Sequence, residues 1–246
     1  MIIIRSQILD QFNNIVFGFS TKIGLDRKPP FNFNMSHSVG DDEKLVEQNR
    51  EAFAKMLGLK SENIAYQKQV HGESIQIVNK GGENGDSDAM ITNRPGIGLA
   101  ISSADCCAIF IYDPVNKVIG AVHSGWRSTE KKILLKTIKL MHKKFGSSYK
   151  DLHCYIAPSI SQINYEVGEE VAKLFKKKFL KRSNEKYLLD VAGANRGMLI
   201  KKGIPRKQIQ CSSLCSFEQE KLLHSYRREG QQSGRAFGII AMMENN

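Results

Sequence analysis

Two histidines and one cysteine, His71, Cys106 and His123, could together bind a transition metal. Imidazole nitrogens and a thiolate suit zinc, and three protein ligands leave the fourth tetrahedral position open, which is typical of a catalytic site. The sequence has no short His-x-x-x-His or Cys-x-x-Cys pair around these residues. Spacing alone therefore leaves a second interpretation open, in which each is a buried packing residue, as free cysteines commonly are.

A predicted β-hairpin would position two of the three residues. Residues 97–112 are rich in β-branched and aromatic side chains, residues 113–117 form a turn signal, and residues 118–123 have the pattern of a returning strand. This pairing can place Cys106 and His123 side by side.

The other predicted elements mix strands with separate helices. We expect short apolar strands at residues 2–4, 15–19 and 75–78, the last just after His71, and a glycine-marked loop at residues 81–85. Helices are expected from the Asp41-Asp42 cap to Gly58, and over residues 129–145, 168–181 and 190–202, the last with Asp190 as N-cap. This order favours a mixed α/β or α+β fold.

The composition is that of a soluble globular protein. Of 246 residues, 41% are hydrophobic and 25% are charged, which are ordinary values for this class. No stretch approaches 18 consecutive apolar residues, so no membrane span is expected. The N-terminal residues 1–5 lack a cleavage site, and the five cysteines do not suggest a disulfide framework. We therefore expect a cytoplasmic protein with reduced thiols.

The net charge of +11 raises the question of an anionic partner. The densest basic block, residues 173–182, is interleaved with apolar residues and is interpreted as the solvated side of an amphipathic helix. A functional basic patch is the alternative. Nucleic acid is not expected as a partner, because the basic residues are spread along the whole chain.

Several ordered motifs resemble those of the YfiH-type family, which carries the older name laccase domain and is also described as purine nucleoside phosphorylase-like. Three of them contain the candidate ligands: Gln69-Val70-His71-Gly72, Ser103-Ala104-Asp105-Cys106 and Val122-His123-Ser124-Gly125-Trp126-Arg127. The others are Phe17–Thr21, Val39–Asp42 with Asn49-Arg50, Ala157–Ile160 with Tyr165–Gly168, Leu189-Asp190 with Ala194–Arg196, and Ser225–Arg228 with Gly234-Arg235. The resemblance covers nearly the whole chain.

The resemblance implies a single domain over residues 1–246 with a layered α/β/β/α sandwich. It also implies that His71, Cys106 and His123 are the metal ligands and carry catalysis. Cys107 lies outside the motif, and on a strand it would point to the other face of the sheet, so we expect it to be a packing residue.

Five further residues are candidates for the reaction. Asp105 is a carboxylate that could orient a ligand or take a proton, and burying it in an apolar segment would require compensation. Arg127, Lys22 and Arg227 are candidate phosphate-binding cations, and Asn34 resembles a substrate-contacting asparagine of the family. Lys22 stands where the family usually has arginine, and lysine lacks the bidentate fork that suits phosphate or carboxylate.

The family resemblance implies a zinc-dependent purine nucleoside phosphorylase that also has adenosine deaminase and methylthioadenosine phosphorylase-type activity. Its substrates would be a purine nucleoside and phosphate. An alternative within the family is a peptidoglycan-editing hydrolase that removes a wrongly incorporated amino acid from a cell-wall precursor. Open-site zinc can activate water or polarise a substrate oxygen, which would serve either reaction.

Two less favoured functions are a copper-dependent polyphenol oxidase and a non-enzymatic zinc protein that binds nucleic acid. Coupled copper clusters need many imidazoles, and the chain has six histidines in total. A single Cu²⁺ could still occupy the zinc site, because copper outcompetes zinc for such ligands. A monomer is expected.

Overall fold

The computed structural model describes residues 1–243, so the last three residues of the domain expected over 1–246 lie outside the described part. Within that part, the strands form two six-stranded sheets and a separate three-stranded sheet. The first sheet has the order β1 (Ile3–Ile4), β2 (Ile15–Ser20), β15 (Ala236–Met242), β7 (Gly98–Ser103), β3 (Ile64–Lys68) and β5 (Gly82–Asp86). The second has the order β14 (Ile209–Cys211), β10 (His153–Ile156), β8 (Cys107–Asp113), β9 (Val118–Ser124), β6 (Ala89–Thr92) and β4 (Ile75–Ile77).

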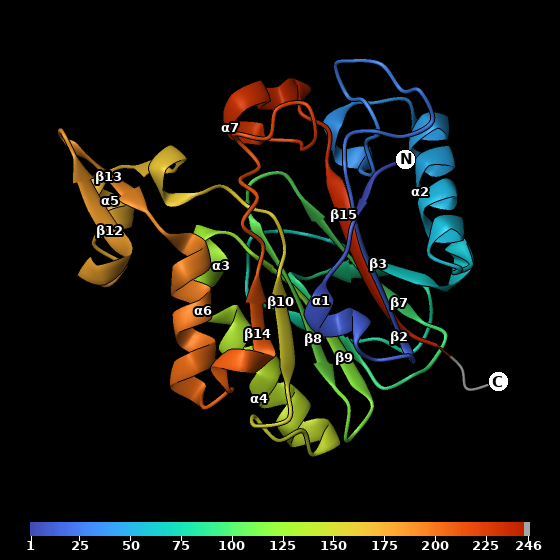
Figure 1. Ribbon diagram of the computed structural model, residues 1–246. Coiled ribbons are helices and arrows are strands. Elements are labelled where there is room, and N and C mark those ends of the chain that lie inside the picture. The colour runs from blue at the N-terminus through green and yellow to red at the C-terminus, as the bar shows by residue number, and fades with distance from the viewer. Residues whose placement is uncertain (244–246) are drawn as a thin grey trace.

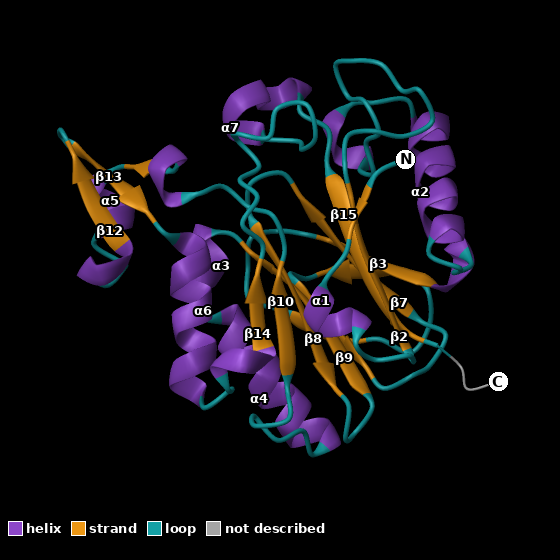
Figure 2. Cartoon of the chain, in the orientation of Figure 1, coloured by secondary structure: helices purple, strands orange, loops and turns teal. Residues whose placement is uncertain are grey.

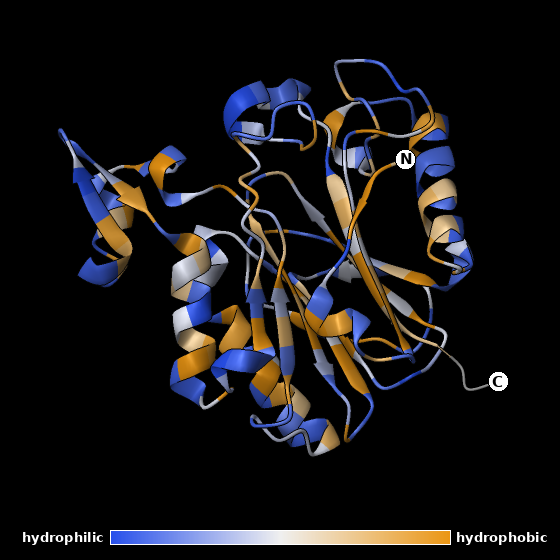
Figure 3. Cartoon of the chain, in the orientation of Figure 1, coloured by the Kyte–Doolittle hydropathy of each residue, from blue (hydrophilic) through white to orange (hydrophobic). Residues whose placement is uncertain are grey.

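The two large sheets pack face to face over an apolar core. Phe17 of β2 contacts Phe110 of β8, with ring centroids 4.9 Å apart, and Tyr155 of β10, with ring centroids 5.1 Å apart. Because side chains alternate along a strand, one face of each sheet contributes to this core and the other face needs a different cover. Figure 3 shows the apolar residues concentrated along these strands.

Helices supply that cover, on opposite sides of the sandwich. The helices are α1 (Gln7–Asp10), α2 (Glu43–Met56), α3 (Trp126–Glu130), α4 (Ile133–Phe145), α5 (Glu169–Ala172), α6 (Val191–Lys202) and α7 (Tyr226–Glu229). α2 packs Phe53, and the residue after the helix, Leu57, against the outer face of the first sheet, whereas α4 and α6 cover the second sheet with residues such as Met141 and Leu199. Figures 1 and 2 show these layers, which form the predicted α/β/β/α sandwich.

Two helices and the hairpin follow the sequence prediction closely. The Asp42 side chain caps α2 by accepting hydrogen bonds from the backbone N–H groups of Lys44 and Leu45, and Asp190 caps α6 in the same way at Gly193. β8 and β9 pair antiparallel in the register Ala108 with His123, which confirms the hairpin for the second half of the apolar segment 97–112. The first half of that segment instead forms β7 of the other large sheet.

The helix predicted over residues 168–181 is wrong. The α-helix ends at Ala172, and residues 180–183 form β12, which pairs with β13 (Lys186–Leu189) in the three-stranded sheet completed by β11 (Glu166–Val167). This small sheet projects from the body beside α6 (Figure 1). Tertiary strand pairing overrides the helical periodicity of this segment. The lysines and arginine within residues 173–182 are all exposed to solvent.

Two smaller corrections concern local backbone. The helix expected over residues 129–145 is broken into α3 and α4 at Lys132, whose φ of 61° lies in the left-handed region. The expected loop over residues 81–85 largely forms β5, which lies parallel to β3. Across residues 1–243, no helix combines the length and apolar character that crossing a bilayer requires.

Candidate functional site

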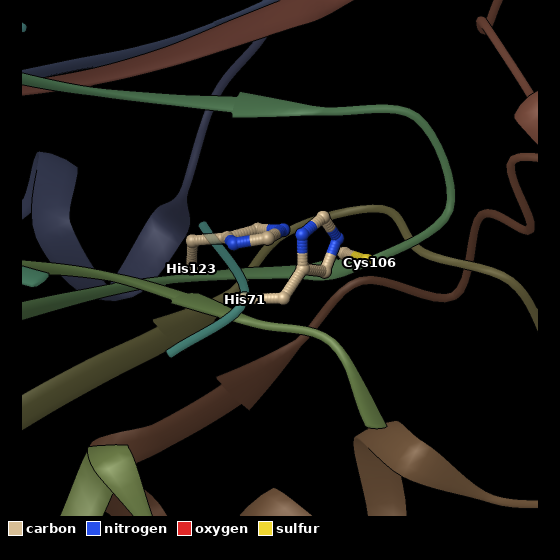
Figure 4. A group of neighbouring side chains, drawn as sticks. All are labelled: His71, Cys106 and His123. Carbon is tan, nitrogen blue, oxygen red and sulfur yellow. The ribbon is translucent and has the colours of Figure 1, made fainter. Parts of the chain in front are cut away.

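The three candidate metal ligands meet at one end of the sandwich, between the two large sheets. His71 lies in the loop after β3, Cys106 in the turn before β8, and His123 near the end of β9. Their ligating atoms all lie within 4.8 Å of one another, and the two imidazole rings are nearly perpendicular, with centroids 4.8 Å apart. Figure 4 shows both rings and the sulfur converging on the same point.

Strand alternation explains why Cys106 and His123 share this space. Ile119 and Ala121 of β9 point into the core between the sheets, so His123 points to the same side. The direct strand partner of His123 is Ala108, and Cys106 reaches the imidazole from the turn, where its carbonyl accepts a 2.6 Å hydrogen bond from the Ser103 hydroxyl.

Cys107 occupies the opposite face. It is fully buried in the core beneath the helices, and its thiol lies 3.6 Å from the Ser159 hydroxyl. Burial raises the pKa of the Cys107 thiol to about 12, so this sulfur stays protonated at neutral pH. These contacts are those expected for a packing residue.

Asp88 organises the candidate site and was not identified from the sequence. Its carboxylate lies 2.7 Å from Nδ1 of His123 and accepts backbone N–H groups of His71 and Gly72 at 3.0 and 2.6 Å. The Asp88 carboxylate thus orients the imidazole of His123 and holds the loop that carries His71. The backbone of His71 is in the left-handed region, with a φ of 56°. The one sequence signal was a carboxylate placed directly before the apolar run Ala89-Met90-Ile91.

Burial alone would raise the pKa of Asp88, but hydrogen bonds from His123 and from the backbone of Gly72 and His71 outweigh it and lower that pKa. The charged carboxylate therefore persists without exposure to solvent. Similarly, burial opposes ionisation of Cys106, yet the neighbouring charge of His123 and hydrogen bonds from both imidazoles lower the pKa of the thiol. Burial disfavours protonated His123, but Cys106 and Asp88 raise its pKa.

Asp105, the carboxylate expected to orient a ligand or take a proton, is held by two hydrogen bonds. Its carboxylate accepts a hydrogen bond from the Ser216 hydroxyl at 2.6 Å and another from the backbone N–H of Arg227 at 2.7 Å. Neither of these contacts reaches an imidazole. Asp105 therefore fastens the turn before Cys106 to the C-terminal segment, and its φ of 94° shows that this turn is a strained conformation for a residue with a side chain.

A cavity of about 550 Å³ opens beside the three ligands. All three line it, together with an aromatic pair, Tyr66 and Phe237. On the wall, the buried side-chain nitrogen of Gln67 has no hydrogen-bond partner within residues 1–243, while its amide oxygen accepts from Ser87 at 2.7 Å. A ligand in the cavity could therefore satisfy a donor that the protein leaves free.

The four residues expected to bind substrate lie outside the lining of this cavity. Lys22 forms a 2.8 Å ion pair with Glu229, and Arg127 lies exposed with its guanidinium 4.2 Å from the centre of the Trp126 ring. Arg227 donates to the carbonyl of Glu166, and Asn34 is fully buried. Two other arginines, Arg50 and Arg235, line the cavity instead. Both occur in the motifs quoted above, which was the signal that could have identified them.

The ion pair of Lys22 makes a prediction about acid stability. Burial would raise the pKa of Glu229, but Lys22 and Arg228 outweigh it and lower this pKa to about 2. A depressed carboxyl pKa gives stability that is present above the unfolded value of 4.5 and lost as the pH falls towards 2. In urea unfolding, Glu229→Gln should cost stability at about pH 6, and the gap from the unmodified protein should shrink by more than half at about pH 3. An unchanged gap would contradict this account of Glu229.

A second prediction concerns Gly125, which follows β9 directly and lies against two of the candidate metal ligands. A methyl group built on Gly125 would lie 2.8 Å from the Cys106 sulfur and 3.3 Å from Cδ2 of His71. We expect Gly125→Ala to displace these two ligands and weaken metal binding, measured by competition with a chromophoric chelator, by about 10-fold or more. Gly72→Ala is the matched control, since there an added methyl group meets only ordinary contacts of 3.4 Å and beyond. Equal metal affinity in both variants would show that the cluster tolerates this crowding.

The donor set fits zinc. A tetrahedral ion with bonds of about 2.0–2.3 Å separates its ligand atoms by roughly 3.3–3.8 Å. The three ligating atoms here lie within 4.8 Å of one another, about 1 Å wider than that range. The contact between Asp88 and Nδ1 of His123 leaves Nε2 as the ligating nitrogen, an arrangement common around zinc.

Comparison with known proteins identifies the family. A family model described as multi-copper polyphenol oxidoreductase laccase matches residues 16–243. The chain belongs to this family. Purine nucleoside phosphorylase YlmD of Bacillus subtilis is 31% identical over 94% of the chain and 89% of its own length. A protein of Deinococcus radiodurans named purine nucleoside phosphorylase is 34% identical, over 91% of the chain and 88% of its own length.

Solved structures of the family share the fold. The crystal structure of the hypothetical protein YfiH of Bacillus licheniformis matches with a TM-score of 0.90 and 29% identity, over 94% of this chain and 93% of that one. That of YlmD from Geobacillus stearothermophilus matches with a TM-score of 0.89 and 28% identity, over 97% and 94%. The mixed α/β sandwich is thus the fold of the family.

Proposed function

We propose that the protein is a zinc-dependent purine nucleoside phosphorylase with additional adenosine deaminase and methylthioadenosine phosphorylase-type activity. The observation that carries the proposal is the open cluster of His71, Cys106 and His123 on the wall of a cavity of about 550 Å³. Relatives named purine nucleoside phosphorylase, at 31% and 34% identity, support the substrate class.

His71, Cys106 and His123 would hold the metal. When bound, zinc supplies a Lewis acid that polarises a substrate oxygen or activates water. Asp88 fixes the tautomer of His123 by keeping Nδ1 protonated and hydrogen-bonded, which directs Nε2 into the cavity.

The cavity walls offer the contacts that a nucleoside needs. Tyr66 and Phe237 contribute two rings to the wall, 5.7 Å apart between centroids, and a purine could pack against the part that Arg50 leaves uncovered. The free amide N–H of Gln67 supplies a donor for a ring nitrogen or a sugar hydroxyl. The protein would thus bind the base on an apolar surface and orient it by few polar contacts.

The cluster does not favour a multicopper oxidase. Among residues 1–243 it is the one group of three or more metal-binding side chains close enough to share an ion. Of the other histidines, His37 pairs with Glu47, His142 lies 2.9 Å from a backbone carbonyl, and His224 is buried. A single Cu²⁺ at the same three ligands remains part of the proposal as the alternative metal.

We further propose a cytoplasmic monomer. All five cysteines are free, which fits a reducing compartment. Residues of one chain supply the ligands and line the cavity, so the proposed site needs no second subunit. Nucleic acid has no part in the proposal.

Product analysis tests the proposed function. The zinc-loaded protein is incubated with adenosine, inosine or methylthioadenosine, with and without phosphate, and the products are separated by chromatography. We expect free purine base only with phosphate, and inosine from adenosine in either case, with both reactions lost in His123→Ala. No turnover of any nucleoside, combined with release of an amino acid from a cell-wall precursor, would replace this proposal with the editing hydrolase.

A further inference from the structure

Two arginines face the same cavity, each with one edge fixed by the protein. Nε of Arg50, on α2, donates to the carbonyl of Met35 at 2.8 Å, and its guanidinium stacks 4.6 Å from the centre of the Tyr66 ring and 5.1 Å from that of Phe237. One terminal nitrogen of Arg50 donates to the exposed carboxylate of Glu47 at 3.3 Å, and the other has no partner within residues 1–243. The hydrogen bonds and stacking thus restrain the planar group and leave one terminal nitrogen free to donate.

Arg235, just before β15, is held in a similar way. One terminal nitrogen donates to the carbonyls of Ser233 and Gly234, at 2.6 and 3.0 Å. Nε and the second terminal nitrogen have no partner within the described chain, and no carboxylate there forms an ion pair with this guanidinium. Arg235 is therefore a half-buried cation on the cavity wall that forms no direct ion pair within residues 1–243, although Asp105 and Glu229 lie near enough to raise its pKa.

A shared piece of backbone fixes the two arginines relative to each other. Met35 accepts from Arg50 through its carbonyl and donates its N–H to the carbonyl of Arg235 at 2.9 Å. Asn34 supports the same arrangement, because its side-chain oxygen accepts the backbone N–H of Arg235 at 2.9 Å. Asn34, which the sequence suggested as a substrate contact, thus holds the backbone of Arg235 in place.

Hydroxyl donors line the cavity with these arginines. Ser36 and Ser38 both belong to the lining, and their hydroxyl oxygens lie 2.9 Å apart. They follow Met35 directly in the chain, which places hydroxyls and guanidinium groups on one stretch of wall.

The charge around these donors is poorly balanced. The carboxylate of Glu47, 3.3 Å from Arg50, is itself 62% exposed, and exposed pairs of this kind are weak. Burial lowers the pKa of both Arg50 and Arg235, which reflects the cost of keeping these cations away from water. A bound anion would offset that cost, and guanidinium and hydroxyl groups are the kinds of donor that bind phosphate.

We infer that Arg50 and Arg235, with Ser36 and Ser38, form the subsite for inorganic phosphate, the second substrate of the proposed phosphorolysis. The inference rests on the proposed function. A phosphate oxygen forms a bond to the anomeric carbon of the sugar while the bond from that carbon to the purine nitrogen breaks. The electron pair of the broken bond leaves with the base, which takes up the proton that phosphate loses, so the products are the free base and the sugar 1-phosphate.

Calorimetric titration of the zinc-loaded protein with inorganic phosphate tests the subsite directly. We expect Arg50→Gln and Arg235→Gln each to weaken phosphate binding by about 10-fold or more, as the loss of a charge-assisted hydrogen bond predicts. Arg206→Gln, which removes the same charge from an exposed site outside the cavity lining, should bind phosphate normally. Arg50→Lys and Arg235→Lys keep the positive charge but lack the paired N–H donors of guanidinium, so they measure how much those paired donors contribute to phosphate binding.

The outcomes separate this inference from the proposed function. Binding that is lost in both glutamine variants, with zinc content and unfolding temperature unchanged, supports the subsite even if no nucleoside is cleaved. Phosphorolysis with an unchanged KM for phosphate in both variants overturns the subsite and leaves the phosphorylase proposal standing. Adenosine monophosphate is titrated in parallel. If it binds through the two arginines while inorganic phosphate does not bind, they recognise a phosphate group carried by a larger substrate, and the inference is wrong.

Discussion

Cys106→Ala is expected to abolish stoichiometric zinc binding and phosphorolysis, whereas Cys107→Ala should retain both. The Cys106 sulfur lies among the ligating atoms of His71 and His123, and it alone of the three donors carries a negative charge to offset that of a divalent metal. Its removal leaves two ligands and a larger opening. We expect the loss of affinity to exceed the roughly 10–100-fold that changes to residues supporting a metal ligand cause.

The adjacent cysteine is the matched control, because the same substitution is made one residue away. Cys107 lies on the opposite face of β8 in the core under the helices, so its truncation affects packing and not the metal. Metal content is measured by atomic emission after dialysis, and activity on adenosine with phosphate. Zinc retained by Cys106→Ala but lost by Cys107→Ala would mean that the strand register around the cluster is wrong.

Asp88→Asn is expected to weaken zinc binding by about 10–100-fold and to lower the unfolding free energy by roughly 1–3 kcal/mol. The amide keeps the shape of the side chain but loses the charge that stabilises His123 and one of the oxygens that accept from the loop around His71. Both imidazoles would then be held less firmly, although neither ligand is changed. The loss should appear in metal competition assays and in urea unfolding.

Asp86→Asn makes the same change two residues earlier, at an aspartate whose side chain is 63% exposed. Its ion pair with Lys68, at 3.9 Å, lies on the surface and should contribute little. Zinc affinity that is the same in Asp88→Asn and Asp86→Asn would show that Asp88 does not support the metal centre.

The elements that local sequence dictates were predictable. The hairpin of β8 and β9 follows from two apolar runs around a turn signal, and strand alternation correctly placed Cys107 away from Cys106. Caps such as Asp42 and Asp190 define helix starts because their side chains bond the first turn. The helix prediction over residues 168–181 was wrong because the end of this segment pairs with β13, and the local sequence pattern does not reveal that partner.

The candidate ligands could be named from motifs, but their supporting contacts could not. Asp88 accepts a hydrogen bond from the loop around His71. His71 lies between β3 and β4, and Asp88 lies between β5 and β6. These two connections meet because β3 pairs with β5 in one sheet while β4 pairs with β6 in the other. Likewise, Arg50 and Arg235 are held together by Met35 and Asn34, about 200 residues before Arg235 in the chain. Charge and motif position alone instead favoured Lys22 and Arg127, which the structure places outside the cavity lining.

The most direct test of the central claim is ³¹P nuclear magnetic resonance of the zinc-loaded protein with adenosine and inorganic phosphate. The account predicts that the phosphate signal falls as a sugar 1-phosphate signal grows, that free base accumulates in equal amount, and that Cys106→Ala shows neither change. Base released without consumption of phosphate, or turnover by Cys106→Ala equal to that of the unmodified protein, would contradict a phosphorylase built on His71, Cys106 and His123.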